Sequence, residues 1–432
     1  RWRAPCSGFE TMIEIKPGHV EDTTVCVPGS KSYTHRMLIA AALSDGACEV
    51  RNPLNSEDTL ITRRCLSEMG VSIEETPDHL QIQGTSGRLR SPENTVDLGN
   101  SGTSMRLMAA VAALGQCVCV LTGSPRMQKR PIQDLLVGLN QLGVGTRSVN
   151  DDGCPPIEVT GGGLKGGSVT VDCRISSQYL SALLMIAPFA KETVTITVSG
   201  GLVSRPYVDM TIDVMKGFGI TVHRNGYERF VVTGGQTYRA GKHAVEPDCS
   251  QAGYFWAAAA ISGAGVTVAG TSKTSLQGDV RFTECLAAMG CRVLEDSDGI
   301  KVTGGPLTGV IVDMADMPDM VPSLAVVAAF ARGNTVIEIV AHRRAKESDR
   351  LGAVAAELTQ MGIEAECVGS GLRIVGGHPQ GAAIDTYNDH RIAMSFALAG
   401  LKVPGIKIKD ETCVKKSFPN FWEVFNSLYR VK

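Results

Sequence analysis

Residues 28–36 of this chain (PGSKSYTHR) combine small residues with basic and hydroxyl side chains, a set suited to binding an anion. They follow the β-branched segment 24–27 and precede the apolar segment 37–43, which predicts a strand, a tight turn and a buried helix. Amides at a helix N-terminus lack acceptors within the helix, and the helix dipole is positive there, so this end favours an anion. With Lys31 and Arg36 added, the turn predicts an oxyanion site; a solvated basic turn is the alternative. It is not a Walker A loop, because no glycine directly precedes Lys31.

Further basic residues gather in a few short segments. Arg126 lies in GSPRMQKR (123–130), Arg391 follows His390, and Lys416 follows Lys415. The segment 343–350 holds Arg343, Arg344, Lys346 and Arg350 together with Glu347 and Asp349. Arginine offers a planar fork to carboxylates and phosphates, whereas lysine acts as a point charge. The set predicts a substrate with several negative groups, bound without a metal; surface charge that serves solubility is the alternative.

The elements that must position these residues repeat along the chain. Six helix-like apolar segments follow polar clusters, at 37–43, 105–114, 180–190, 254–261, 324–331 and 392–401. Amphipathic segments alternate with them and close on Gly70, Gly143, Gly219, Gly290 and Gly362, spaced by 73, 76, 71 and 72 residues. A fixed period of this kind indicates structural repeats. We therefore expect six units of about 72 residues.

Each unit is expected to run strand, apolar helix, strand, amphipathic helix and two strands. In the first unit these are residues 24–27, 36–43, 47–51, 58–69, 71–74 and 80–83. Strands joined through helices imply right-handed parallel crossovers, hence an α/β fold. The sixth unit stops after its second helix (421–428), and residues 13–15 could supply its missing strand. That predicts one domain from residues 12–27 plus 246–432 and a second from 28–245, with 1–11 as a tag or leader.

Composition limits the remaining possibilities. At 432 residues and 43% hydrophobic, the chain can bury a large core in two domains, and its net charge of −2 gives no drive toward nucleic acid or membrane. The 13 cysteines are scattered, without zinc-like spacing, which favours free thiols in a reducing, cytoplasmic compartment. No run of 18 apolar residues is present. The glycine-rich run 161–167 opens no apolar helix, so we interpret it as a turn rather than a nucleotide loop.

Eight ordered motifs from residue 28 onward resemble those of the 3-phosphoshikimate 1-carboxyvinyltransferases, also called 5-enolpyruvylshikimate-3-phosphate synthases. They are PGSKSYTHR (28–36), LGNSGTSMR (98–106), GSPRMQKRP (123–131), SSQYLSALLM (176–185), VSRPYVDMT (203–211), RAKESDRL (344–351), YNDHRIAM (387–394) and KKSFPNF (415–421). The resemblance implies the two-domain enolpyruvyl transferase fold, with three βαβαββ units per domain (an inside-out α/β barrel) closing over the substrates. It implies transfer of an enolpyruvyl group from phosphoenolpyruvate to the 5-hydroxyl of shikimate 3-phosphate, releasing phosphate. No cofactor is expected, the partners are small anionic molecules, and the chain is expected to be a monomer.

The resemblance also implies roles for individual residues. Asp319 would take the hydroxyl proton, Glu347 would shuttle a proton at the methylene, and Lys31 would complete the catalytic set. Shikimate 3-phosphate would contact Lys31, Ser32, Arg36, Ser176, Ser177, Gln178, Ser204, Tyr207, Asp319, His342 and Lys346. Phosphoenolpyruvate would contact Lys31, Asn100, Gly102, Arg126, Gln178, Glu347, Arg350, His390, Arg391 and Lys416. Two positions depart from the family: His342 stands where relatives carry Asn, and Leu107 where many carry Pro.

Two alternatives share the expected fold. A UDP-N-acetylglucosamine enolpyruvyl transferase would lack a serine after the first lysine and use a loop cysteine, whereas this chain has Ser32 and no cysteine in residues 126–130. A non-catalytic homologue is disfavoured because Asp319 and Glu347 are both present. The family is the target of glyphosate, which occupies the phosphoenolpyruvate site, and Gly102 is expected to border that site.

Overall fold

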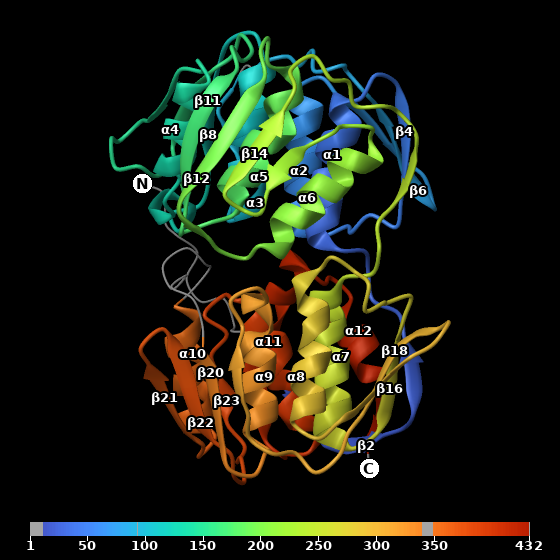
Figure 1. Cartoon of the computed structure of the whole chain (residues 1–432). Coiled ribbons are helices and arrows are strands. Elements are labelled where there is room, and N and C mark those ends of the chain that lie inside the picture. Colours follow the sequence, from blue (N-terminus) through green and yellow to red (C-terminus); the bar gives the residue numbers. More distant parts are fainter. Residues whose placement is uncertain (1–11, 93, 339–348, 432) are drawn as a thin grey trace, which may run out of the picture.

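The computed structural model describes residues 12–92, 94–338 and 349–431, and it folds into two lobes stacked end to end (Figure 1). Three predicted site residues, His342, Lys346 and Glu347, lie outside the described residues. Within the described ranges, none of the helices has the length and apolar character needed to cross a membrane.

The six apolar segments form buried helices, as predicted. They are α1 (Lys31–Leu43), α3 (Gly102–Val111), α5 (Gln178–Ile186), α7 (Cys249–Ser262), α9 (Val321–Ala328) and α11 (His390–Ala397). The amphipathic helices that alternate with them are α2 (Glu57–Glu68), α4 (Gln133–Gln141), α6 (Pro206–Gly217), α8 (Phe282–Ala288), α10 (Arg350–Gln360) and α12 (Phe421–Asn426). The glycines that close these helices have φ between +78° and +111°, a conformation that glycine adopts without strain.

Six sheets surround the buried helices, and each has one parallel pair with the other pairs antiparallel. The first lobe holds β15 (Lys242–Ala244)–β4 (Ala47–Arg51)–β6 (His79–Gln83)–β5 (Ser72–Glu75), β7 (Val96–Asp97)–β8 (Val118–Thr122)–β10 (Ile157–Thr160)–β9 (Thr146–Ser148), and β11 (Gly167–Cys173)–β12 (Val194–Leu202)–β14 (Arg229–Val232)–β13 (His223–Asn225). The second lobe holds β3 (Thr23–Val25)–β16 (Gly265–Ala269)–β18 (Gly299–Thr303)–β17 (Arg292–Glu295), β19 (Ile311–Asp313)–β20 (Asn334–Glu338)–β22 (Gly371–Val375)–β21 (Glu364–Val368), and β23 (Ala383–Ile384)–β24 (Ile406–Lys409)–β1 (Met12–Ile15). Residues 161–166 of the glycine-rich run connect β10 to β11, which begins at Gly167, so the run opens no helix.

The N-terminal strands complete the second lobe. The predicted strand at residues 13–15 is β1, which pairs antiparallel with β24 and completes the sixth sheet. The next strand, β2 (Gly18–Val20), pairs antiparallel with β25 (Tyr429–Val431), a pair that the sequence did not predict. Two further strands exchange between the lobes: β3 pairs with β16 of the fourth unit, and β15 pairs with β4 of the first.

The chain passes between the lobes along two adjacent segments. Gly29 and Pro247 form an antiparallel bridge, the Ser30 amide donates to the Glu246 carbonyl at 2.8 Å, and the Asp248 amide donates to the Pro28 carbonyl at 2.9 Å. Two separate hydrophobic cores lie on either side of this connection, one drawn from residues 33–245 and the other from 15–27 plus 249–428. The domain boundaries near Pro28 and Val245 stay a prediction.

Candidate functional site

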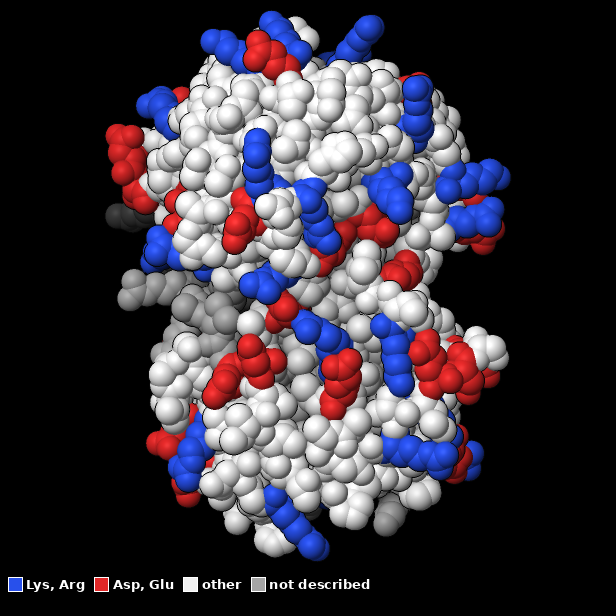
Figure 2. All heavy atoms as spheres, in the orientation of Figure 1, with Lys and Arg blue, Asp and Glu red and all other residues white. Residues whose placement is uncertain are grey.

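A polar pocket lies between the lobes, where the N-termini of buried helices from both cores face each other. Figure 2 shows the molecule narrowing at this level, with side chains of both charges around the waist. Twelve predicted site residues line the pocket: Lys31, Ser32, Gly102, Ser176, Ser177, Gln178, Ser204, Tyr207, Asp319, Arg350, His390 and Arg391. Arg36, Asn100, Arg126 and Lys416 are not among its lining residues.

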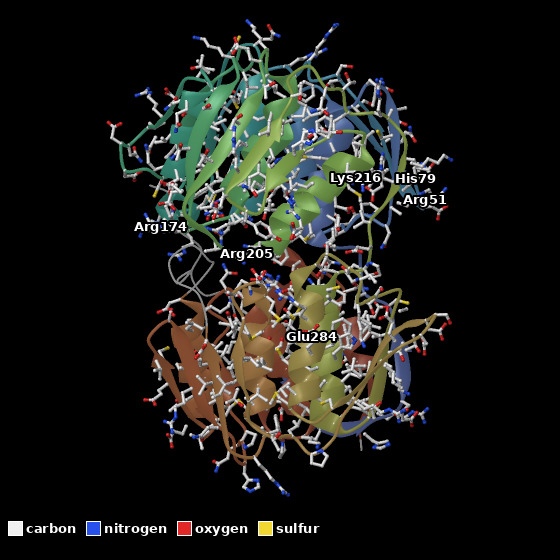
Figure 3. All side chains as sticks on the ribbon, viewed as in Figure 1. Arg51, His79, Arg174, Arg205, Lys216 and Glu284 are labelled. Carbon is white, nitrogen blue, oxygen red and sulfur yellow. The ribbon has the colours of Figure 1, made fainter. Side chains whose placement is uncertain are left out.

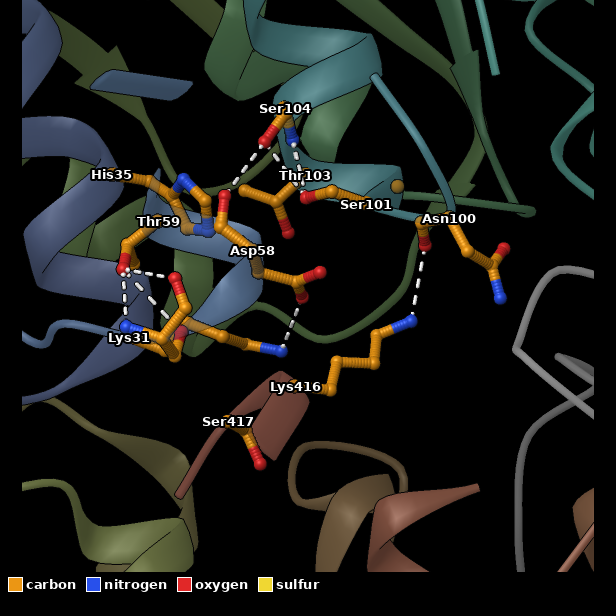
Figure 4. A network of polar contacts seen from close by, with 12 residues as sticks. Lys31, His35, Asp58, Thr59, Asn100, Ser101, Thr103, Ser104, Lys416 and Ser417 are labelled. Atoms are coloured by element: carbon orange, nitrogen blue, oxygen red, sulfur yellow. Dashed lines mark hydrogen bonds and ion pairs between the residues drawn. The ribbon is translucent and has the colours of Figure 1, made fainter. Parts of the chain in front are cut away.

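The start of α1 is held by residues of the protein itself. The Lys31 amide donates to the Asp248 carboxylate at 2.9 Å, and the same carboxylate accepts from the Ser250 amide at 2.8 Å, so it also caps α7. The Lys31 ammonium forms an ion pair with Asp58 at 3.1 Å (Figure 4). The oxyanion site expected at this helix end is therefore occupied in part by Asp248, while the Lys31 side chain, paired with Asp58, and Ser32 line the pocket.

Arg36 lies behind the pocket rather than at its surface. Its guanidinium is 1% exposed and donates to the Ser32 carbonyl at 2.8 Å, the Tyr207 carbonyl at 3.1 Å and the Thr211 hydroxyl at 2.7 Å. These bonds join α1 to α6, which carry Ser32 and Tyr207. In this arrangement Arg36 positions two lining residues.

The first turn of α3 meets both lobes. Arg106 donates to the Gly102 carbonyl at 3.3 Å and to the Gln178 side chain at 3.1 Å, and Arg130 donates to the Asn100 carbonyl at 3.2 Å. From the other lobe, the Lys416 ammonium also donates to the Asn100 carbonyl, at 3.0 Å (Figure 4). Lys416 is thus brought beside the glycine-containing turn although it lies outside the pocket lining.

Asp319 lies between two arginines on the side of the second lobe. One carboxylate oxygen pairs with Arg350 at 2.8 Å, and the other pairs with Arg391 at 2.9 Å. Arg350 also pairs with the fully buried Asp389 at 3.0 Å. The Tyr207 hydroxyl of the first lobe donates to Asp319 at 3.3 Å, so the carboxylate is held from both lobes. Burial raises the pKa of Tyr207 well above its usual value, and the charges of Asp279 and Asp319 raise it further, so this hydroxyl donates as a neutral phenol.

A second carboxyl group lies beneath the pocket. Asp279 is 5% exposed and accepts a hydrogen bond from the Ser250 hydroxyl at 2.5 Å. Burial, followed by the charge of Asp319, raises its pKa to about 6. Among the described residues, no group of three or more His, Cys, Asp or Glu side chains could hold a metal ion.

Comparison with known proteins agrees with the motifs. The family model described as EPSP synthase (3-phosphoshikimate 1-carboxyvinyltransferase) matches residues 16–425. The chain belongs to the EPSP synthase family. It is 46% identical over 405 residues to the 3-phosphoshikimate 1-carboxyvinyltransferase of Syntrophobacter fumaroxidans, covering 93% of this chain and 96% of that protein. It is 42% identical over 421 residues to the enzyme of Yersinia pseudotuberculosis, covering 96% and 98%. It also matches the structure of an EPSP synthase from Acinetobacter baumannii with a TM-score of 0.82 and 30% identity, covering 97% of this chain and 98% of that one.

Membership of the EPSP synthase family agrees with the predicted fold, but sequence reasoning missed several pocket residues. These are Asp58, Thr103, Arg106, Arg130, Ile175, Val203, Asp248 and Ser250. Arg106 and Arg130 lie within the quoted motifs, where their charge alone could have selected them. Asp248 and Ser250 occupy the polar cluster before the fourth apolar helix, equivalent to the Lys31 cluster in the first unit. Comparing the polar clusters that precede the apolar helices, unit by unit, would have selected both residues.

A further contact between the lobes involves Arg205, the residue after the pocket-lining Ser204. The Arg205 amide donates to the Asp316 side chain at 3.1 Å, and Asp316 also pairs with Arg281 at 3.2 Å. Figure 3 places Arg205, together with Arg174, on the side of the first lobe that faces the second. Each is adjacent in sequence to a residue that lines the pocket, Ser204 and Ile175 respectively.

Proposed function

We propose that this protein transfers the enolpyruvyl group of phosphoenolpyruvate to the 5-hydroxyl of shikimate 3-phosphate and releases phosphate, a step of the shikimate pathway toward chorismate and the aromatic amino acids. The relatives named above carry this activity in their names. One observation carries the proposal at the site: Asp319 lies between Arg350 and Arg391 and faces Lys31 across a pocket shared by the two lobes. In this arrangement the carboxylate of Asp319 would act as a base beside basic side chains that would bind anions.

The hydroxyl and amide groups of the first lobe are assigned to shikimate 3-phosphate. Ser176, Ser177 and Ser204 line the pocket beside Ser32 and Tyr207, and they would bind its phosphate and ring substituents. Gln178, Lys346 and His342 belong to the same proposed set. For Arg36 to contact the shikimate carboxylate, its guanidinium would exchange the Tyr207 carbonyl for the ligand.

Phosphoenolpyruvate is assigned to the charged groups nearest the second lobe. Arg350 and Arg391 would bind its carboxylate in a planar, forked geometry, and Lys31, Arg126 and Lys416 would bind its phosphate. Asn100, Gly102 and Gln178 would border the reacting carbons, with His390 nearby. Arg106 and Arg130 flank Gly102 and add positive charge on that side.

The reaction needs one base for the hydroxyl and one acid and base at the methylene. As the 5-oxygen bonds to C2 of phosphoenolpyruvate, Asp319 would take the hydroxyl proton and C3 would gain a proton to become a methyl group. In the second step the methyl group loses a proton, the C2–phosphate oxygen bond breaks, and phosphate leaves. Glu347 is proposed for the proton transfers at C3. No cofactor is required by this scheme, because no net oxidation or reduction takes place.

Phosphate release measured with both substrates tests the proposal. We expect release only when shikimate 3-phosphate and phosphoenolpyruvate are present together, with none when either is left out. UDP-N-acetylglucosamine in place of shikimate 3-phosphate is the control for the related transferase. Release with that sugar nucleotide, or none with any acceptor, would contradict the assignment. We further propose that the protein is cytoplasmic and acts as a monomer. Light scattering of the purified chain would measure its mass and so test the monomeric state.

A further inference from the structure

A buried chain of hydroxyl groups links α1, α2 and α3 behind the pocket. Figure 4 shows its α3 end, where Ser104 contacts Ser101 and Asp58. The His35 ring nitrogen Nδ1 lies 2.8 Å from the Thr62 hydroxyl, which lies 2.8 Å from the Ser104 hydroxyl. Ser104 in turn lies 2.7 Å from the Ser101 hydroxyl and donates to the Asp58 carbonyl at 3.2 Å. The side chains of His35, Thr62, Ser101 and Ser104 are all fully buried. None of them lines the pocket, so the proposed function uses none of them.

The donors and acceptors of this chain can be ordered from its chemistry. Burial lowers the pKa of His35 to about 3, so the ring is neutral and carries one N–H. Among the described residues the other ring nitrogen, Nε2, has no hydrogen-bond partner, and a buried N–H without an acceptor is costly, so the proton belongs on Nδ1. His35 therefore donates to Thr62, Thr62 donates to Ser104, and Ser104 donates to the Asp58 carbonyl. Because the single Ser104 proton goes to the Asp58 carbonyl, Ser101 donates to Ser104, whose oxygen accepts from both Thr62 and Ser101. The three bonds from His35 to the Asp58 carbonyl point one way, and such bonds strengthen one another in a low dielectric.

The α3 end of the chain reaches pocket residues by two routes. Ser101 is the N-cap of α3 and accepts from the Ser104 amide at 3.4 Å, while Gly102 and Thr103, the next two residues, line the pocket. Ser104 also donates to the Asp58 carbonyl, and the Asp58 carboxylate pairs with the Lys31 ammonium. His35, at the other end, lies one turn after Lys31 on α1. Ser176 and Ser204, which are assigned to shikimate 3-phosphate, precede α5 and α6, whereas the hydrogen bonds of the chain given above join α1, α2 and α3.

We propose that the His35–Thr62–Ser104–Ser101 chain is a positioning device that fixes the first turn of α3 relative to Lys31 and thereby sets affinity for phosphoenolpyruvate rather than for shikimate 3-phosphate. This inference rests on the proposed function. A helix N-terminus binds an anion through fixed amides, so a small displacement of Gly102 and Thr103 weakens that interaction.

Thr62→Val tests the proposal because valine keeps the shape of threonine and removes the central link. We expect the KM for phosphoenolpyruvate to rise about fivefold, the effect of one buried hydrogen bond lost. The KM for shikimate 3-phosphate and kcat should stay within about twofold. Thr62→Ser restores a hydroxyl and should recover most of the loss. Thr335→Val is the matched control, since Thr335 is a buried threonine of β20 whose hydroxyl has no recorded partner among the described residues.

A double-mutant cycle makes the test sharper. Ser104→Ala breaks the same chain one link further on, so Thr62→Val with Ser104→Ala should raise the KM for phosphoenolpyruvate no more than the larger single effect. The proposal would be overturned if the KM values for phosphoenolpyruvate and shikimate 3-phosphate changed equally or not at all. It would also be overturned if the effects of Thr62→Val and Ser104→Ala on the KM for phosphoenolpyruvate were fully additive. If Thr62→Val does not fold, Ser104→Ala alone carries the same expectation. A wild-type chain that releases no phosphate would refute the proposed function, whereas an active wild type without the KM split would refute only the positioning chain.

Discussion

Replacing Gly102 with alanine should weaken inhibition by glyphosate more than it weakens use of phosphoenolpyruvate. A Cβ atom on Gly102 would lie 2.3 Å from Nη2 of Arg130 and 2.6 Å from Nη1 of Arg106. Both guanidinium groups line the pocket and are held, by Asn100 in one case and by Gln178 in the other. The methyl group therefore cannot be added without moving side chains that face the ligand.

The size of the effect follows from the cost of overpacking. Inserting a methyl group into a filled site costs about 1–3 kcal/mol, which corresponds to a factor of about 5 to 160 in affinity. The flexible ends of the two arginines can relieve part of this strain. Glyphosate is somewhat longer than phosphoenolpyruvate, so it has less room to shift and should lose more affinity. We expect its inhibition constant to rise several times more than the KM for phosphoenolpyruvate.

Paired inhibition curves at fixed phosphoenolpyruvate measure this difference. Gly217→Ala is the control, because a Cβ atom at Gly217, the last residue of α6, would meet no atom within 4 Å. That variant should match wild type in both constants. If Gly102→Ala and wild type are inhibited equally, Gly102 does not border the inhibitor, and the assignment of the α3 turn to phosphoenolpyruvate fails.

Three other outcomes are expected. Asp319→Asn, and likewise Glu347→Gln, should keep substrate binding but lower kcat by about 10²- to 10⁴-fold, so near-normal turnover would remove the proposed proton-transfer roles. Shikimate 3-phosphate with a phosphoenolpyruvate mimic should reduce the radius of gyration in solution scattering, because anionic ligands would bridge both lobes; an unchanged radius would argue against closure. The free energy of unfolding should fall as pH rises from about 4 to 6 because of Asp279. Its pKa is raised from 3.8 to about 6 in the folded protein, so over this range the unfolded chain has already lost the proton that the folded protein still holds. Urea unfolding of Asp279→Asn should show a smaller decline over that range, and an identical decline would exclude Asp279 as its source.

The repeat could be predicted from the sequence because it depends on local patterns. Apolar runs, amphipathic runs and closing glycines are each encoded within about one helix length, and all six buried helices were found in this way. The exchange of β3 and β15 between lobes could be anticipated only through the missing strand of the sixth unit. The pair β2–β25 has three residues per strand, too few to give a periodic signal.

The basic residues of the site could be predicted from the sequence, whereas the carboxylates of Asp58 and Asp248 could not. Basic residues at helix starts stand out in a sequence, whereas Asp58 and Asp248 resemble ordinary solvated charges. Their roles come from long-range contacts: Asp248 lies 217 residues from the Lys31 amide that it binds. The inward position of Arg36 likewise depends on Tyr207 and Thr211, which sequence spacing does not bring near it.

The pairing of Asp319 with Arg350 and Arg391 would connect substrate binding to proton transfer. Among the described residues, Arg350 pairs with Asp319 and Asp389, and Arg391 pairs with Asp319. A substrate carboxylate on the same arginines would add a further negative charge, and like charges in a shared site favour a protonated carboxyl group. Phosphoenolpyruvate binding would thus help Asp319 to take the proton of the attacking hydroxyl. Asp319→Asn removes that repulsion, so the inactive variant should bind phosphoenolpyruvate, in the presence of shikimate 3-phosphate, at least as tightly as wild type. Calorimetric titration would show it, and clearly weaker binding would mean that Asp319 serves mainly to hold the arginines in place.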